Sequence, residues 1–323
     1  MEKKKVAVGI DIGGTNTVFG FVDKEGHILG EDRIKTSQYD EIEVFVAALY
    51  EKIMITANKI GDGIDIIGYG IGAPMGNINK GTIEHSADLP WKGIVPLAGI
   101  FNRHTPLPVL VTNDANAAAV GEMIYGGAKG MKNFVVITLG TGLGSGFVID
   151  GKLVYGHDGF AGEIGHTAIR PGPSNRDCGC GRKGCLETYV SATGLKRSLL
   201  KIMADSLEPS ELRKYSFEDL SAEMIHDAAK RGDYIAKRAF THTGRMLGFK
   251  LADVVAHTNP EAIFLFGGLA LAKDLIFEPA KEYMEDNLLS IYKGKVKLLP
   301  SQLSTQNAAV LGASSLVWSD RND

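Results

Sequence analysis

The sequence EIGHTAIRPGPSNRDCGCGRKGCLE covers residues 163–187 and contains all three cysteines of the 323-residue chain. Glycines separate Cys178, Cys180 and Cys185, and His166 lies twelve positions before the first of these thiols. Zn²⁺ prefers four tetrahedral nitrogen or sulfur ligands, and glycine-rich turns let closely spaced thiolates point at one centre. The stretch therefore predicts a zinc site whose ligands are His166, Cys178, Cys180 and Cys185.

Other uses of the three cysteines are weaker. A disulfide would leave one thiol over, and the sequence shows no secretory signal. Inert buried cysteines would not need the flanking glycines, and a zinc ribbon usually pairs two C-x-x-C knuckles where this chain has one cluster. Because four protein ligands leave no open position for water, we expect the metal to be structural.

Two carboxylates border this stretch. Glu163 lies three residues before His166, and Glu187 lies two residues after Cys185. A metal bound to these neighbours would fix both carboxylates near one point. Since carboxylates accept hydrogen bonds from hydroxyl groups, we expect them to bind a polyhydroxylated ligand.

The same stretch resembles the signature of the ROK family, which comprises bacterial sugar kinases and sugar-responsive regulators. The pattern is G-H followed by C-x-C-G-x-x-G-C-x-E, and it falls on Gly165, His166, Cys178, Cys180, Gly181, Gly184, Cys185 and Glu187. The resemblance implies an α/β, actin-like ATPase (ribonuclease H-like) fold. Two duplicated lobes would then close on a cleft.

Two glycine-rich segments support such a duplication. Residues 6–22, VAVGIDIGGTNTVFGFV, predict a strand, a tight turn and a second strand, and residues 134–151 repeat the design. A shift of 127 positions aligns Gly13 with Gly140 and Asp23 with Asp150. Neither turn matches the P-loop or the Rossmann pattern, which disfavours dinucleotide binding.

Taken alone, the first turn is equally consistent with a plain hairpin and with a phosphate-binding loop. The resemblance implies that both turns bind the phosphates of ATP, with Mg²⁺ between them and Asp11 near the metal. It also implies that the adenosine lies against the glycine pair after the strand at 262–269. The nucleotide contacts predicted in this way are Asp11, Gly13, Gly14, Thr15, Gly140, Thr141, Gly142, Gly267 and Gly268.

Asn113 and Asp114 follow a short apolar strand at 109–112 and precede an alanine-rich helix. Asp114 is a good candidate for the N-cap of that helix. The resemblance instead makes it the catalytic base of an N-D motif. A helix N-terminus lowers the basicity of a carboxylate, but the loose transition state of phosphoryl transfer requires positioning more than basicity.

Further elements complete the predicted lobes. Apolar spacing indicates a crossover helix at 40–60 and helices at 191–201, 217–229, 233–257 and 270–276, and strands are expected at 64–71 and 262–269. A closing helix at 307–318 returns, by the resemblance, to the first lobe. We expect a small lobe of residues 1–117 with 305–323, and a large lobe of residues 118–304 that carries the zinc site.

Three other features carry less information. The loop ending in Asn77 follows a strand, where the resemblance places sugar contacts, but Asn77 is a weaker candidate than the two glutamates. Trp91 is expected in the core, although an indole can also pack on a sugar face. His226, His242 and His257 show no ligand spacing and are expected to be surface or core residues.

The charge of the chain argues against polyanionic partners. The net charge is -3 with a pI of about 6.3, so no basic surface for nucleic acid or for a membrane is expected. No apolar run reaches the length of a membrane span, and the chain is expected in the cytoplasm. ROK regulators carry a winged helix-turn-helix before the first turn, where this sequence has five residues before Val6.

These observations and the resemblance together imply an ATP-dependent hexose kinase acting on the 6-hydroxyl group. Glucose is the best candidate substrate, with fructose, mannose, allose and N-acetylated hexosamines as alternatives. The sugar would be held by Asn77, Asn113, Asp114, Glu163, His166 and Glu187, with Asp114 as base. The resemblance also implies a homodimer.

Overall fold

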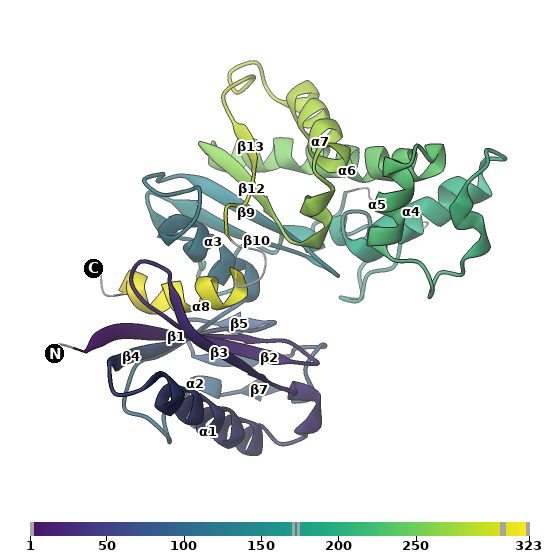
Figure 1. Cartoon of the computed structure of the whole chain (residues 1–323). Helices are drawn as coiled ribbons and strands as arrows, with labels where there is room; N and C mark the ends of the chain where they lie inside the picture. The colour runs from purple at the N-terminus through teal and green to yellow at the C-terminus, as the bar shows by residue number, and fades with distance from the viewer. Residues whose placement is uncertain (1–2, 170–171, 173–174, 304–307, 321–323) are drawn as a thin grey trace.

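Two five-stranded sheets, each built on one of the glycine-rich hairpins, form the cores of two lobes (Figure 1). The computed structural model describes residues 3–169, 172, 175–303 and 308–320. The first sheet has the order β3-β2-β1-β4-β8, with bounds Lys4–Ile12 (β1), Thr17–Val22 (β2), Ile28–Ile34 (β3), Ile64–Gly72 (β4) and Val109–Thr112 (β8).

The second sheet repeats this arrangement. Its order is β11-β10-β9-β12-β13, with bounds Phe134–Leu139 (β9), Leu143–Ile149 (β10), Lys152–Leu153 (β11), Ala262–Phe266 (β12) and Lys297–Pro300 (β13). In each sheet the hairpin strands are antiparallel, and the next two strands run parallel to the first hairpin strand. Matching order and direction confirm the predicted duplication.

The two hairpins differ in the length of their turns. Ile12 pairs with Thr17, which leaves residues 13–16 as the first glycine turn. Leu139 pairs with Leu143, which leaves residues 140–142 as the second glycine turn. The second turn is therefore one residue shorter, a difference that the 127-residue shift does not reveal.

Helices α3 (Asp114–Ile124) and α8 (Ala308–Asp320) cross between the two sheets (Figure 1). α8 packs on β1 and β4 and also against α3, which covers β9 and β10. Glycines permit the close approach, because a Cβ on Gly9 or Gly70 would lie 2.0 or 1.9 Å from a carbonyl oxygen of α8. The predicted return of the closing helix to the first lobe is confirmed, although Asn307 lies outside the described residues.

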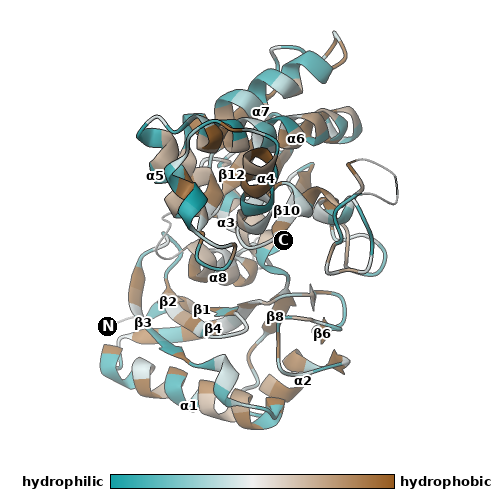
Figure 2. Ribbon diagram, turned by 90° about the vertical axis from the view of Figure 1, so that its right-hand side faces the viewer, coloured by the Kyte–Doolittle hydropathy of each residue, from teal (hydrophilic) through white to brown (hydrophobic). Residues whose placement is uncertain are grey.

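The outer face of the first sheet is covered by α1 (Ile42–Ile60), whose hydrophobic and hydrophilic residues alternate in Figure 2. Its buried side chains include Phe45 and Leu49. The prediction that Trp91 belongs to the core is confirmed: it is 5% exposed, and its ring centroid lies 4.7 Å from that of Phe45. A small sheet beside this core and a short helix were not predicted: β5 (Gly76–Asn77), β6 (Thr82–Glu84), β7 (Ile94–Val95) and α2 (Leu97–Phe101).

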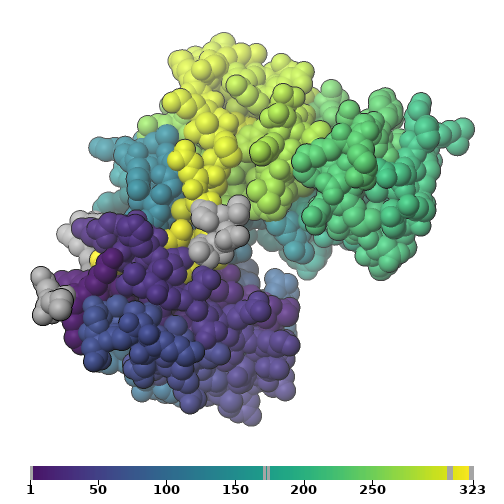
Figure 3. Space-filling model, in the orientation of Figure 1, coloured from purple at the N-terminus to yellow at the C-terminus, as the bar shows by residue number. Residues whose placement is uncertain are grey.

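In the second lobe, α6 (Tyr234–Thr258) and α7 (Asp274–Asn287) share one hydrophobic core with the sheet. Helices α4 (Ala192–Ala204) and α5 (Ala222–Lys230) form an arm that extends beyond the sheet (Figure 1). The helix expected at 270–276 is wrong in its bounds: a 3₁₀ turn covers Gly268–Ala272 and α7 starts later, because Lys273 adopts a positive φ of 50°. Figure 3 shows an open notch between this arm and the first lobe. Within the described residues, no helix is long and apolar enough to cross a membrane.

Candidate active site

A cavity of about 890 Å³ lies where the two lobes meet. Its lining comes from both glycine turns, from the start of α3 and from the borders of the cysteine stretch. The predicted site residues that it brings together are Asp11, Gly14, Thr15, Asn113, Asp114, Gly140, Thr141, Gly142, Glu163, Glu187 and Gly267. Gly13, Asn77, His166 and Gly268 are not among the lining residues.

Asp114 is the first residue of α3 and is not its cap. The side chain of Asn113 caps the helix by accepting a hydrogen bond from the N–H of Asn116 at 2.7 Å. Asp114 Oδ1 accepts the N–H of Ala115 at 2.9 Å. The capping alternative considered for Asp114 is therefore corrected, and its carboxylate lines the cavity.

Asp11 approaches Asp114 at the carboxyl ends of β1 and β4. A Cβ on Gly72 would lie 3.9 Å from Asp11 Oδ1 and 3.8 Å from the Cα of Asp114. Burial and the nearby charge of Asp114 raise the pKa of Asp11 to about 6. Burial also raises the pKa of Asp114, against the hydrogen bond from Ala115. The site therefore concentrates negative charge where a cation or a hydroxyl proton can be bound.

The two border glutamates face the same cavity from different turns. Glu163 precedes the 3₁₀ turn Ile164–His166, and Glu187 lies in the 3₁₀ turn Leu186–Thr188. Burial raises the pKa of Glu163, and the charges of Asp114 and Glu187 act in the same direction. Glu187 Oε2 accepts the N–H of Leu143 at 3.0 Å. The expected convergence of the two carboxylates is therefore present.

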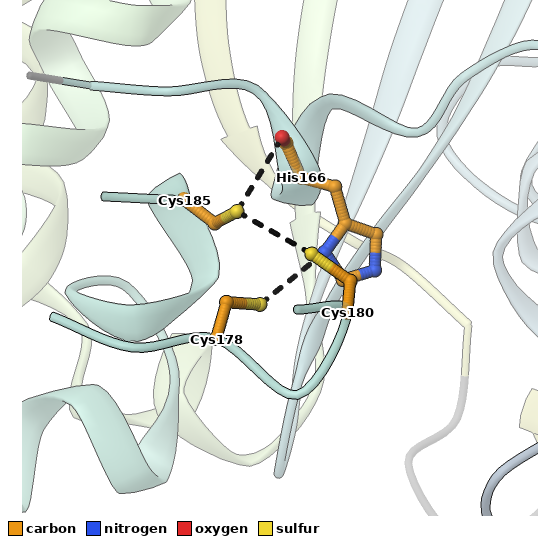
Figure 4. A group of neighbouring side chains, drawn as sticks. All are labelled: His166, Cys178, Cys180 and Cys185. Atoms are coloured by element: carbon orange, nitrogen blue, oxygen red, sulfur yellow. Dashed lines mark hydrogen bonds between the residues drawn. The ribbon is translucent and has the colours of Figure 1, made fainter. Parts of the chain in front are cut away.

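The four predicted metal ligands lie together next to the segments that carry these two glutamates (Figure 4). Their ligand atoms all lie within 4.8 Å of one another. Cys180 Sγ is 3.7 Å from Cys185 Sγ, and Cys178 Sγ is 3.6 Å from His166 Nδ1. A tetrahedral zinc with Zn–S bonds of about 2.3 Å separates neighbouring sulfurs by about 3.8 Å. The cluster is compatible with zinc in both chemistry and spacing.

Arg176 attaches the cysteine loop, residues 175–185, to α4. Its guanidinium donates to the carbonyls of Thr188 and Gly194 at 2.7 and 3.1 Å, and to Ser198 Oγ at 3.0 Å. It also lies over the ring of Tyr189, 4.3 Å from the centroid. This partly buried cation therefore holds the loop beside the turn that carries Glu187.

Asn77 is buried and fully engaged away from the cavity. Its amide nitrogen donates to Glu84 Oε1 at 3.3 Å and to the carbonyl of Asp158 at 2.7 Å. Its amide oxygen accepts the N–H groups of Asn79 and Lys80 at 3.0 and 3.3 Å. Since all its hydrogen-bonding positions are used, the structure gives no support to a sugar contact by Asn77.

The model of the ROK family matches residues 7–320 of the chain. The chain belongs to the ROK family. Its actin-like ATPase fold follows from the paired sheets and from the similarity to solved ROK structures.

Three relatives illustrate the range of this ROK protein's similarity. It is 35% identical to a glucokinase of Halalkalibacterium halodurans over 320 residues, which cover 98% of this chain and 96% of that protein. A ROK glucokinase from Streptomyces griseus, solved in complex with glucose and AMPPNP, is 32% identical with a TM-score of 0.79, covering 96% and 98% of the two chains. The xylose repressor of Caldicellulosiruptor bescii is 29% identical, and the match covers 97% of this chain and 78% of the repressor.

The ROK protein has a second cavity that the sequence did not predict. It measures about 630 Å³, adjoins the second glycine turn and contains the predicted Gly268. Three polar side chains of α5 line it, Glu223, His226 and Asp227, with Phe240 beside them. His226 was expected to be only a surface or core residue. These residues lie about eighty positions from the turn and resemble the polar face of an ordinary helix, so no local pattern signals them.

Proposed function

We propose that this chain is an ATP-dependent glucokinase, which transfers the γ-phosphoryl group of ATP to the 6-hydroxyl of glucose. The observation that carries the proposal is the cavity in which Asp114, Glu163 and Glu187 face both glycine turns. The glucokinase relatives at 33–35% identity support the same activity. An acceptor sugar and a phosphate donor would thus meet in one place.

Each group in the cavity has a proposed task. Asp114 accepts the proton of the attacking hydroxyl, and Asn113, Glu163, His166 and Glu187 hold the other hydroxyls. The glycine turns, including Gly13, Gly14, Thr15, Gly140, Thr141 and Gly142, bind the phosphates through backbone N–H groups. The nucleoside extends past Gly267 into the second cavity, where Gly268 lies.

Mg²⁺ and Zn²⁺ complete the proposal. The buried carboxylate of Asp11 lies at the cavity, in a position suited to hold Mg²⁺ or its waters. Bound Mg²⁺ would neutralise charge on the phosphates. Zn²⁺ on His166 and the three cysteines would be structural, because all four ligands come from the protein.

The lobes proposed to close on the substrates are residues 1–117 with 305–323, and residues 118–304. We further propose a cytoplasmic homodimer. A set of free thiols gathered at one metal site suits a reducing compartment, and light scattering of the purified chain measures the oligomeric state.

An ADP-release assay over a panel of hexoses with ATP and Mg²⁺ tests the proposed function. We expect glucose to give the highest kcat/KM, ahead of fructose, mannose, allose and N-acetylated hexosamines. A sugar that lacks a matching hydroxyl leaves a buried carboxylate unpaired, which costs about 1–3 kcal/mol. If a different hexose is phosphorylated best, that hexose replaces glucose as the proposed substrate. If no sugar is phosphorylated, the proposed kinase activity is wrong.

The repressor relatives favour one alternative, a sugar-responsive transcription regulator. The chain spans 78% of the length of the Caldicellulosiruptor bescii xylose repressor. The net charge of -3 provides no general attraction for DNA. Sequence-specific DNA binding in a gel-shift assay, released by a sugar, would support this alternative.

A further inference from the structure

The second glycine turn is in contact with both turns that carry the proposed sugar ligands. Leu143, which follows it, donates its N–H to Glu187 Oε2 at 3.0 Å. A Cβ on Gly142 would lie only 2.5 Å from that same carboxylate oxygen. On the other side, a Cβ on Gly165 would lie 2.2 Å from the carbonyl oxygen of Leu143. Glu187 and Gly165 therefore hold the end of the turn from two sides.

A further tie anchors the start of the turn. The N–H of Ala192, the first residue of α4, donates to the carbonyl of Gly140 at 2.9 Å. α4 and the turn containing Glu187 both follow the cysteine loop directly along the chain. The conformation of the second glycine turn thus depends on the segment that is proposed to bind sugar.

The contact with Glu187 has an electrostatic consequence. Its carboxylate uses the N–H of Leu143 and places a negative charge beside a turn proposed to bind anionic phosphates. Like charges a few ångströms apart in a partly buried cavity repel each other strongly. A sugar hydroxyl that donates to Glu187 would share its charge and draw the carboxylate off the turn.

We infer that Glu187 couples the two substrates: without sugar it weakens nucleotide binding at the second glycine turn, and sugar relieves that effect. The inference rests on the proposed kinase function. By linkage, the nucleotide must strengthen sugar binding by the same factor. Such coupling would limit the hydrolysis of ATP in the absence of an acceptor.

Glu163 provides a matched control in the same cavity. It is also a carboxylate on a turn bordering the metal cluster, and its pKa is raised by burial. Among the hydrogen bonds of the described residues, none joins its carboxylate to either glycine turn. Glu163→Gln therefore removes a carboxylate from the same cavity while leaving the N–H of Leu143 bound to Glu187.

The experiment measures the Kd of Mg²⁺–AMPPNP by calorimetry, with and without saturating glucose, for the full chain and its variants. For the unmodified chain we expect glucose to lower this Kd by about tenfold, within the usual range of coupling between sites. For Glu187→Gln we expect tighter AMPPNP binding without glucose, by up to about tenfold, and little further effect of glucose. For Glu163→Gln we expect weaker glucose binding. At saturating glucose, however, the Kd of Mg²⁺–AMPPNP should fall by the same factor as in the unmodified chain.

Each outcome decides one point. Equal AMPPNP affinity without glucose in Glu187→Gln and in the unmodified chain would overturn the inference, as would the absence of coupling in the unmodified chain. A purely structural role of Glu187 predicts weaker AMPPNP binding, the opposite sign. Glu187→Ala repeats the measurement if Glu187→Gln does not fold. Failure of the unmodified chain to bind any hexose would instead reject the proposed function.

Discussion

Asp114 combines two influences that act on its pKa in opposite directions. Burial raises the pKa, whereas its hydrogen bond from Ala115 at the start of α3 lowers it. Because Asn113 already caps the helix, the carboxylate of Asp114 is available to the cavity. The residue is thus placed for proton acceptance through its position at the junction of β8 and α3.

Replacing Asp114 should separate catalysis from binding. The Asn side chain in Asp114→Asn has the shape of aspartate but cannot accept the proton, so we expect kcat to fall by about 10²–10⁴-fold. The KM for glucose should change only a few-fold. Asp88→Asn, which alters another acid of the same cavity, should have a much smaller effect. Near-normal kcat in Asp114→Asn, measured by ADP release, would contradict the assignment of the base.

Asp11 should reduce the stability of the empty protein at neutral pH. Its pKa is raised from 3.8 to about 6 in the fold, so the folded state binds a proton more tightly than the unfolded chain. The resulting penalty is absent below pH 4, develops between pH 4 and 6, and is complete above pH 6. A difference of about two pH units corresponds to about 3 kcal/mol.

Asp11→Asn should therefore raise the free energy of unfolding by about 2–3 kcal/mol at pH 8 and have little effect at pH 4. Urea titrations without nucleotide or Mg²⁺ measure the difference. Asp65→Asn, at an exposed position of β4, is the control and should show no such gain. Equal effects of Asp11→Asn at the two pH values would show that charge burial is not the cause.

At the scale of elements, two separate sets of interactions hold the cysteine loop in place. The thiol and imidazole cluster fixes its tip, and Arg176 attaches its start through two hydrogen bonds to α4 and one to the turn that carries Glu187. Burial lowers the pKa of Arg176 to about 10, so it remains charged at neutral pH. We expect that Arg176 keeps the loop near α4 when the metal is removed. Arg176 alone should not hold Glu187 in its position in the cavity.

Metal removal should reduce sugar affinity and stability together. After treatment with a chelator we expect the KM for glucose to rise by about tenfold or more and the Tm to fall by several degrees, because metal binding is linked to folding. Added Zn²⁺ should restore both values. Unchanged sugar affinity in a preparation shown by elemental analysis to be metal-free would contradict the structural role of the cluster.

The elements that sequence reasoning located are those with a strong local pattern. The glycine hairpins, the N-D junction and the cysteine cluster each carry their signal within a few residues. The strands β5 to β7 have two or three residues each and show no periodicity to detect. The hydrogen bond from Asn77 to the carbonyl of Asp158 could not be predicted, because the two residues are distant in sequence. The second cavity forms only when α5 packs beside the second glycine turn.

At the scale of the whole molecule, α3 and α8 join the two lobes. Glycines on both partners allow this contact, since a Cβ on Gly121 would lie 2.8 Å from the Cα of Gly312. Glu122 adds a polar tie by accepting the N–H of Gln302 at 3.0 Å and the hydroxyl of Ser301 at 2.5 Å. These contacts hold residues 301 and 302 against α3.

A methyl group between α8 and the first sheet should be costly. Gly70→Ala places a Cβ 1.9 Å from the carbonyl oxygen of Ala313, and a backbone atom cannot rotate away. We expect a loss of about 1–3 kcal/mol or more in the free energy of unfolding. The control is Gly99→Ala in α2, where nothing lies within 4 Å of the added carbon. Equal urea midpoints for the two variants would contradict this packing.

The position of α8 also bears on the order in which a newly made chain can fold. Residues 308–320 leave the ribosome long after β1 and β4, the strands that they cover. Until α8 has been made, the apolar face of these strands has no native cover, while α1 can already protect the opposite face. The emergence of α8 should therefore be the step that completes the core of the first lobe, and the uncovered face should be open to non-native contacts until then.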